Sequence, residues 1–410
     1  MQTYDSYKES GIDWLGEIPN HWELKRIKHL YHIGRGRVIA QTELVYNGKY
    51  PVYSSQTLNN GILGYINTFD FNDEILTWTT DGANAGTVFL RRGKFNCTNV
   101  CGTLKPFTVN NLDHNLYSLS YVANYYKRPD TNGAKIMNNE MAEIVLPLPP
   151  ISEQEAIAAF LDEKCGKIDI LVSVKEQQIA LLKERRQMVI HKAVTKGNQP
   201  NVEMKYSGID WIGEIPKHWE VKRLKYIFRI LKRIAGQLGY DVLSITQKGI
   251  KVKDITSGEG QLAMDYSKYQ YAFKGDFAMN HMDLLTGWVD ISSYNGVISP
   301  DYRVFELINK NNIDKYFLQL LQDCYRNKTF YAHGQGVSMV GRWRFPTENF
   351  NNFYFPIPPI SEQEAIVAYL EEQTGKIDQA ITLKTEQIAK LKAYKQSLIN
   401  EVVTGKVKVA

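Results

Sequence analysis

The sequence predicts an α/β (α+β) protein in which two mixed α/β domains, related by pseudo-twofold symmetry, are separated by a long antiparallel two-helix coiled coil. Three observations support this prediction. A signature of 19 residues occurs twice, and a PPISEQEAI segment occurs twice. Each PPISEQEAI segment opens a long stretch in which apolar residues recur at alternating steps of three and four.

The chain consists of two copies of one unit. Residues 10–28 (SGIDWLGEIPNHWELKRIK) and 207–225 (SGIDWIGEIPKHWEVKRLK) are identical at 15 of 19 positions, at an offset of 197. PPISEQEAI occupies 149–157 and 358–366, at an offset of 209, so the second middle segment is 12 residues longer. Self-similarity at a fixed long period indicates a duplicated structural unit.

Each PPISEQEAI segment is expected to begin a long helix. Ser152-x-x-Glu155 and Ser361-x-x-Glu364 match the capping-box pattern, and the preceding prolines prevent an earlier start. Each helix would run for about 42 residues, roughly 63 Å at 1.5 Å per residue.

The apolar spacing in both helices is that of a coiled-coil seam with a period of 3.5. The first seam is interrupted by Lys175 and Arg186, and the second by Lys384 and Lys395, each 209 positions later. Polar seam residues cost stability and fix the register. The alternative, in which each helix packs on its own domain, is less favoured because ordinary globular helices are much shorter. The seam residues are Ile168, Val172, Ile179, Leu182, Ile377, Ile381, Ile388 and Leu391.

The middle segments combine strand and helix patterns. Residues 66–107 and 269–307 are punctuated by glycine and rich in β-branched and aromatic residues, which predicts strands and turns. Residues 112–128 and 313–328 predict helices. The signatures and long helices are nearly copied while the middles have diverged, which indicates two equal docking frames that carry two different binding regions.

Composition limits the function. A chain of 410 residues with 43% hydrophobic residues suits two or more domains, and a net charge of +5 is too small for a polycation. Four cysteines make no disulfide framework at this length, which indicates a reducing compartment. Cys97 and Cys101 lack a matching Cys/His pair, so they predict half-buried strand residues and no metal site. No apolar stretch reaches about 18 residues, so we expect a soluble, cytoplasmic protein.

No catalytic motif is found. The chain has no G-x4-G-K-[ST] phosphate loop, no G-x-S-x-G elbow and no H-E-x-x-H. The segment PLPPI lacks the asparagine of the Asn-Pro-Pro-aromatic motif of amino-methyltransferases. Gly34-Arg35-Gly36 is a lone G-x-G that predicts a turn, and His21 and His218 of the signature predict structural or docking roles. The sequence therefore predicts a binding protein with no catalytic residue, metal or cofactor of its own.

Loops that mix basic, amide and glycine residues are candidates for contact with nucleic acid. Arginine reads guanine and Asn or Gln reads adenine, while lysine mostly contacts phosphate. A solvated loop residue is the simpler interpretation of any single one, but as a set the loops favour a reading surface. The candidates are Arg35, Arg37, Thr80, Asn84 and Lys135 in the first half, and Gln247, Lys248, Asn280, His281, Gln335, Arg342 and Arg344 in the second.

The signature, the PPISEQEAI helix start and the twofold repeat together resemble the specificity subunit of type I restriction-modification systems, over residues 8 to about 406. The resemblance implies two target-recognition domains, about 20–148 and 217–357, and two long helices, about 152–195 and 361–404. Each recognition domain would read one half of a bipartite, asymmetric DNA site. The corresponding division of the whole chain is 1–151, 152–198, 199–360 and 361–410.

The resemblance also implies partners. Two modification subunits would bind S-adenosylmethionine and methylate adenine, and two restriction subunits would use ATP and Mg²⁺, so this chain would be a non-catalytic subunit. The signature would frame the base of each recognition domain near the modification subunit. It is expected to pack Trp14, Ile18 and Trp22 into each domain and to leave Glu17, Glu23, Lys25 and Arg26 outside. The expected partner-docking residues are Trp14, Trp22, Trp211 and Trp219.

Two other interpretations stay open at this point. A stand-alone DNA-binding protein or decoy would need no docking surface, so the four tryptophans would be core residues only. A coiled-coil scaffold would bind no DNA at all.

Overall fold

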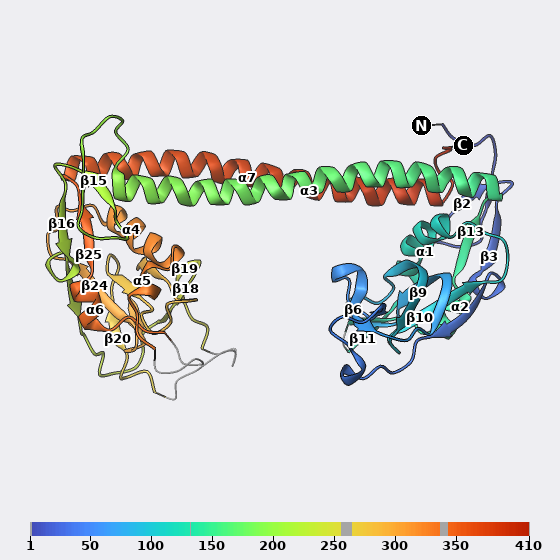
Figure 1. Cartoon of the computed structure of the whole chain (residues 1–410), viewed down its shortest axis with the longest axis horizontal. Helices are drawn as coiled ribbons and strands as arrows, with labels where there is room; N and C mark the ends of the chain where they lie inside the picture. Colours follow the sequence, from blue (N-terminus) through green and yellow to red (C-terminus); the bar gives the residue numbers. More distant parts are fainter. Residues whose placement is uncertain (1, 132, 256–264, 337–342, 410) are drawn as a thin grey trace. The chain divides into compact units, whose positions relative to one another are not determined.

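The structure, a computed structural model, describes residues 2–131, 133–255, 265–336 and 343–409. These residues form two compact units (Figure 1). Unit 1 comprises residues 1–176 and 385–410, and unit 2 comprises residues 177–384. Each long helix therefore contributes one part of its length to each unit.

Unit 1 is built on a six-stranded sheet of order β4-β10-β7-β9-β5-β6, antiparallel except for the parallel β5–β9 pair. Its strands are β1 Tyr7–Glu9, β2 Glu17–Pro19, β3 Glu23–Arg26, β4 Tyr31–Arg35, β5 Tyr50–Tyr53, β6 Ile62–Ile66, β7 Phe71–Thr79, β8 Asp81–Gly82, β9 Val88–Cys97, β10 Cys101–Pro106, β11 Arg128–Asp130, β12 Gly133–Lys135 and β13 Val145–Leu148. Its helices are α1 Leu112–Tyr126, α2 Asn138–Glu143, the start of α3 Ile151–Lys196 and the end of α7 Ile360–Val403. Short 3-10 turns lie at Ile27–His29, Gln41–Glu43 and Leu58–Gly61.

One core of unit 1 lies between this sheet and α1. Trp78 of β7 is fully buried there, and its indole N–H donates to Ile136 O at 2.9 Å. Leu119 and Val122 of α1 pack in the same core. The predicted strands at 66–107 and the predicted helix at 112–128 are therefore present, the helix ending two residues early.

Unit 2 contains two four-stranded sheets, β17-β24-β21-β22 and β19-β18-β23-β20. Its strands are β14 Met204–Tyr206, β15 Glu214–Pro216, β16 Glu220–Arg223, β17 Phe228–Leu231, β18 Val242–Thr246, β19 Gly249–Val252, β20 Gln270–Ala272, β21 Phe277–Met279, β22 Val289–Ile291, β23 Gly296–Ile298, β24 Arg303–Leu307 and β25 Tyr354–Ile357. Its helices are α4 Asp314–Arg326, α5 Thr329–Ala332, α6 Thr347–Asn352 and the start of α7 Ile360–Val403, with a 3-10 turn at Leu224–Tyr226. The predicted helix at 313–328 corresponds to α4.

The main core of unit 2 is aromatic. Phe228, Phe277, Phe305 and Phe317 come from three strands and α4, and their rings meet Phe228 at centroid distances of 4.9–5.8 Å. Edge-to-face packing of this kind adds roughly 0.5–1.5 kcal/mol per pair beyond the burial of area.

The long helices begin one residue earlier than predicted, and the capping-box prediction is wrong. The amides of Glu153 and Gln154 donate to Pro150 O at 2.9 Å, so Ser152 lies inside the first turn and does not cap it. The start of α7 is built in the same way, on Pro359 O. In both copies, a proline carbonyl accepts the hydrogen bonds from the first free amides of the helix, in place of a serine side chain.

In unit 1 the two long helices lie side by side and antiparallel (Figure 1). Lys175 Nζ donates to Gln387 Oε1 at 2.7 Å, and Lys395 Nζ lies 2.7 Å from Asp169 Oδ2. Later residues of α3 thus meet earlier residues of α7. The polar residues that interrupt the seam are therefore partnered across the helix pair.

Unit 2 repeats these pairings with the roles of the helices exchanged. Lys384 Nζ donates to Gln178 Oε1 at 2.6 Å, and Arg186 Nε donates to Asp378 Oδ1 at 2.9 Å. Each of the four residues has its counterpart in unit 1 at an offset of 209. Shifting the register by one heptad would break all four pairings, which is how polar seam residues select one alignment.

Burial along both helices follows the predicted seam spacing. Among the seam residues, Ile168, Val172 and Ile377 are buried, and Ile179, Leu182, Ile381, Ile388 and Leu391 are half-buried. Where the structure describes the chain, no helix combines the length and the apolar character that a membrane span requires.

An ion pair joins α3 to α4 in unit 2 and gives a prediction for pH. His191 Nδ1 lies 2.8 Å from the buried Asp323 Oδ2, and the hydrogen bond to Asp323 raises the pKa of His191. The pKa of His191 in the folded protein therefore lies above its unfolded value of about 6.5. The ion pair stabilises the fold fully below about pH 6.5, and this stabilisation is lost as the pH rises through the folded-state pKa. We expect His191→Gln to lower the free energy of unfolding by roughly 0.5–1 kcal/mol more at about pH 5.5 than at about pH 9, because the half-exposed pair is partly screened. Denaturant unfolding at both pH values measures this, and equal losses would contradict it.

Candidate nucleic-acid interface and its frame

The two repeated motifs of each copy meet in space and form a frame. In unit 1, β3 at the end of the signature pairs antiparallel with β13, which leads directly into α3. In unit 2, β16 pairs with β25 in the same way. The divergent middle segment is therefore closed at its base by a strand pair, in which one strand belongs to the signature and the other immediately precedes PPISEQEAI.

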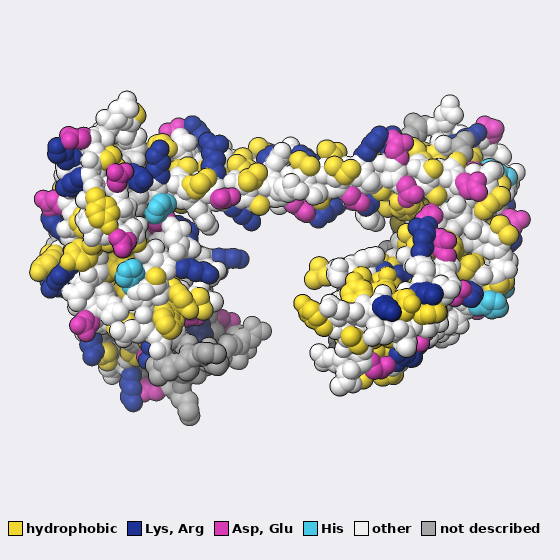
Figure 2. Space-filling view, in the orientation of Figure 1, with side chains coloured by type: hydrophobic (Ala, Val, Ile, Leu, Met, Phe, Trp, Pro, Cys, Tyr) yellow, Lys and Arg dark blue, Asp and Glu magenta, His cyan; other side chains and the backbone are white. Residues whose placement is uncertain are grey.

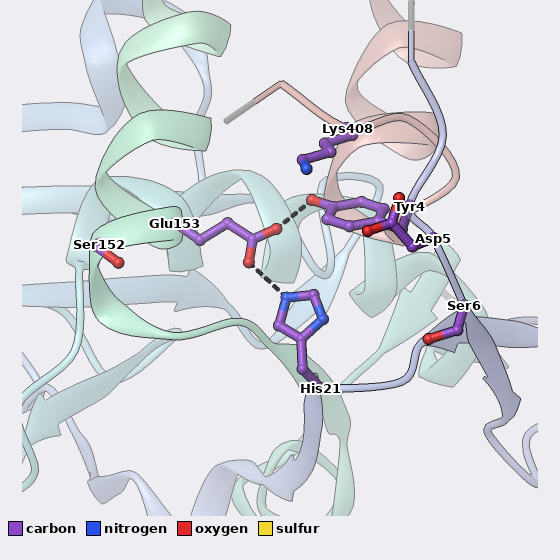
Figure 3. A pocket seen from close by; sticks show the side chains of 7 residues that line it. All are labelled: Tyr4, Asp5, Ser6, His21, Ser152, Glu153 and Lys408. Carbon is purple, nitrogen blue, oxygen red and sulfur yellow. Dashed lines mark hydrogen bonds and ion pairs between the residues drawn. The ribbon is translucent and has the colours of Figure 1, made fainter.

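The first turn of α3 carries the contact that fixes this frame. Glu153 accepts from the indole N–H of Trp22 at 3.2 Å and from the hydroxyl of Tyr4, and its second oxygen lies 2.9 Å from His21 Nε2. Figure 3 shows the side chains of Tyr4 and His21 pointing toward Glu153, with Lys408 nearby. Burial, together with Glu153, raises the pKa of Tyr4, so its hydroxyl stays a donor.

Unit 2 contains the same contact. Glu362 accepts from the indole N–H of Trp219 at 2.9 Å and lies 2.6 Å from His218 Nε2. The neighbouring glutamines also correspond, because Gln154 accepts the amide of Asn111 and Gln363 accepts the amide of Ile313, both at 2.9 Å. In both units, the Glu of Ser-Glu-Gln binds the His-Trp pair of the signature, and the Gln binds the start of the helix in the middle segment. The long helix is thus joined to both.

We expect Glu153→Ala and Glu362→Ala each to destabilise the protein by about 1–3 kcal/mol. Each substitution leaves a buried indole N–H without an acceptor, and an unpaired buried donor costs about 1–3 kcal/mol. The matched controls are Glu155→Ala and Glu364→Ala, which remove exposed carboxylates two residues further along the same helices. Denaturant unfolding gives the four free energies, and equal losses in the Glu153 and Glu362 variants and in their controls would contradict this role.

The four tryptophans predicted to dock a partner lie inside the frame. Trp22 and Trp219 are fully buried. Trp14 and Trp211 are half-buried and stack on Tyr125 and Phe353, with ring centroids 4.6 and 5.3 Å apart. Their observed contacts are those of core residues, and direct docking by their rings stays a prediction. As expected, Ile18 is buried, and Glu17, Glu23 and Arg26 are exposed, while Lys25 is half-buried.

The candidate residues of unit 1 gather around the turn that joins β9 to β10. Arg35 donates to Asn99 O in that turn and, through Nη2, to Thr80 Oγ1 at 3.4 Å. Gly36 permits this approach, because a Cβ at that position would lie 2.3 Å from Cys97 O. The predicted turn at Gly34-Arg35 is wrong, since both residues belong to β4.

The other candidates of unit 1 join the same group. The Nδ2 of Asn84 donates to Ser55 O at 3.0 Å, and Lys135 lies opposite Asp81 in the β12–β8 ladder. Thr80 itself is fully buried, and its hydroxyl donates to Val100 O at 3.1 Å. In this conformation Thr80 supports the turn and does not face solvent.

Two of the basic candidates are held by carboxylates. Arg37 lies 2.8 Å from Glu43 Oε2 and 3.1 Å from Asp70 Oδ2, and Lys135 lies 3.1 Å from Asp130 Oδ2. Glu43 raises the pKa of Arg37, which therefore stays charged. Contact between these cations and DNA would have to displace or share the carboxylates.

The candidates of unit 2 also come together from three separate segments. The Nε2 of Gln247 donates to Thr286 O at 3.4 Å. His281 O accepts from Phe345 N at 2.8 Å, and Gln335 and Arg344 exchange backbone hydrogen bonds at 2.8 Å. Gln247, Lys248, Gln335 and Arg344 are exposed, and Asn280 and His281 are half-buried. Arg342 lies outside the described residues.

His281 is uncharged at neutral pH. Burial, with Arg303 and Arg344 nearby, lowers its pKa to about 3. Its Nδ1 is buried without a hydrogen-bond partner among the described residues. His281 can therefore offer a neutral donor or acceptor but not a positive charge.

Two buried arginines anchor these loops and were missed in the sequence. Arg303 donates to Phe345 O at 3.0 Å and holds the segment that contains Arg344. Arg91 donates to Asn60 O at 2.8 Å and stacks on Tyr53. Arg91 lies in the run FLRRGKF, and the presence of basic residues between apolar, strand-forming ones was the signal that the sequence offered.

Cys97 and Cys101 form no recognisable metal site with the other residues that the structure describes. Cys97 and Cys101 are both buried and unbridged, and the described part of the chain holds no cluster of three His, Cys, Asp or Glu residues suited to a metal. The thiols are more buried than the half-buried positions that the sequence predicted.

The chain belongs to the family described as type I restriction modification DNA specificity domain, which matches residues 19–180 and 216–393. Over 437 aligned residues it is 28% identical to the type I restriction enzyme MjaVIII specificity subunit of Methanocaldococcus jannaschii, covering 98% of this chain and 97% of that one. Over 142 residues it is 45% identical to a Mycoplasma pneumoniae protein named as a type I specificity subunit N-terminus, covering 33% of this chain and 74% of that one.

Solved structures share the fold. A chain from a study of assembly and conformational transition of the type I R-M system aligns with a TM-score of 0.69 at 12% identity, over 95% of this chain and 99% of that one. The HsdS subunit from Thermoanaerobacter tengcongensis aligns with a TM-score of 0.51 at 13% identity, over 99% and 100%. Both are similar to this chain over its whole length.

Proposed function

We propose that this chain is the DNA specificity subunit of a type I restriction-modification complex, in which each unit reads one half of a bipartite, asymmetric site. Residues 1–151 and 199–360 would be the two target-recognition domains, and 152–198 and 361–410 the long helices. One observation carries the proposal: two nearly identical frames hold two divergent middle segments, and in each segment the candidate DNA residues gather from three separate parts of the sequence.

The candidate residues suit the edges of DNA bases and the phosphate backbone. Arg35 and Arg344 can approach guanine, the exposed Gln247 and Gln335 can approach adenine, and Lys248 can meet phosphate. Because the net charge is only +5, affinity would depend on these local groups and on the partner subunits.

The partners we propose are two modification subunits and, with them, two restriction subunits. Two equal frames offer two equal docking places to identical partners. The long helices also expose apolar side chains (Figure 2), of the kind that marks protein interaction surfaces. Beyond the first turns of the helices, these are Ile170, Leu171, Val174 and Tyr394 in unit 1, and Leu181, Met188 and Leu383 in unit 2.

The chain would contribute no catalytic group. The relatives are named specificity subunits, which is a non-catalytic role, and S-adenosylmethionine, ATP and Mg²⁺ would bind to the partner subunits. A stand-alone DNA-binding protein or decoy is not favoured, since it would need neither the second frame nor the exposed helix residues.

Co-expression with the modification subunit of the same system tests this proposal. We expect the two to co-purify, and we expect the complex to bind one DNA sequence far more tightly than an unrelated sequence. Sequence-specific binding by this chain with no association would favour the stand-alone alternative. Association without any sequence preference would contradict the specificity role.

A further inference from the structure

The loop between β5 and β6 of unit 1 has an unusual backbone. Asn59 and Asn60 are consecutive residues in the left-handed region, with φ values of 48° and 52°. Left-handed conformations cost a residue with a Cβ roughly 1–2 kcal/mol each, so two in succession need support from their surroundings. Both side chains are exposed at the tip of the loop.

Buried Arg91 supplies that support. Its side chain is 2% exposed, its Nη1 donates to Asn60 O at 2.8 Å, and its guanidinium lies over the rings of Tyr53 and Phe89 at 3.6 and 4.2 Å. Burial lowers the pKa of Arg91, and no carboxylate pairs with it among the described residues. A buried cation without an acidic partner is costly, and here its hydrogen bond holds the loop.

The loop is joined to the candidate interface of unit 1. Asn84 donates to Ser55 O at 3.0 Å, and Thr98 of the β9–β10 turn donates its amide to Tyr53 O at 2.9 Å. The same turn binds Arg35. The loop therefore lies next to the candidate DNA residues although it is separated from them in sequence.

The side chains of Asn59 and Asn60 make no hydrogen bond within the described part of the chain. A strained loop, anchored by Arg91 through Asn60 O, thus presents two free amides. An amide that donates and accepts at once matches the major-groove edge of adenine. We propose that Asn59 and Asn60 read base edges in the half-site that unit 1 recognises, an inference that rests on the function proposed above.

Glycine substitutions separate reading from folding. Glycine adopts the left-handed conformation without strain, so Asn59→Gly and Asn60→Gly keep the loop and remove only the amides. The matched control is Asn201→Gly, because Asn201 is the exposed left-handed asparagine of unit 2 (φ 61°) and lies outside the candidate interface. All three are tested in the complex with the modification subunits.

The measurement is the rate of adenine methylation on DNA duplexes that carry single changes throughout the site. We expect discrimination at one or two base pairs of one half-site to fall by about 10-fold to 100-fold in the Asn59 or Asn60 variant, with the other half-site and the Asn201 variant unchanged. If both loop variants kept the discrimination of the wild-type protein, this inference would be overturned and the proposed function would be unaffected. Loss of discrimination in both half-sites would overturn it as well, since it would indicate a structural effect. A wild-type complex without sequence preference would contradict the proposed function itself.

Discussion

Replacing residues 20–148 with the corresponding segment of another family member is expected to change one half of the recognised DNA site completely and to leave the other half unchanged. The exchanged segment contains the six-stranded sheet, α1 and their common core, and both members of the β3–β13 pair. It leaves Glu153 in place to bind the His-Trp pair of the incoming segment. Sites with the original first half should no longer be methylated.

Sequencing of methylated adenines in DNA modified by the exchanged complex gives both half-sites in one experiment. The unchanged second half serves as the internal control for assembly and activity. A change in both half-sites would show that the two units do not read independently.

Inserting four residues in the middle of both long helices is expected to lengthen the spacer of the recognised site by one or two base pairs. Four residues add about 6 Å of helix, and one base pair rises about 3.4 Å. The expectation rests on the length of α3 and α7, each a single uninterrupted helix of 46 and 44 residues.

The matched control places the insertion in only one helix, so that the pairing of Lys175 with Gln387 and that of Lys384 with Gln178 can no longer both form. That variant should lose stability without gaining a defined longer spacer. An unchanged spacer in the double insertion would contradict a dependence of spacer length on helix length.

Most of the architecture could be predicted because its signals are local and occur twice. The helix seam depends on a spacing of three and four residues, and burial in α3 and α7 follows it residue by residue. Motif duplication also located the frame. The contact within it could not be predicted, because Glu153 and Trp22 are 131 residues apart and only the folded chain brings them together.

The candidate interface was predictable as a set of loops but not atom by atom. Thr80 lies in a polar, glycine-flanked run, yet its hydroxyl donates to the backbone of the turn between β9 and β10. Arg91 and Arg303 are arginines in strands, and their sequence context does not distinguish a buried loop anchor from a surface charge. Burial of such groups depends on packing between strands distant in sequence, which residue patterns do not encode locally.

Mapping methylated adenines in DNA modified by the wild-type complex tests the central claim most directly. The account predicts one asymmetric motif with two different half-sites separated by a spacer of fixed length, with methylation lost when this chain is omitted. A single continuous or palindromic motif, or an unaltered methylation pattern without this chain, would contradict it.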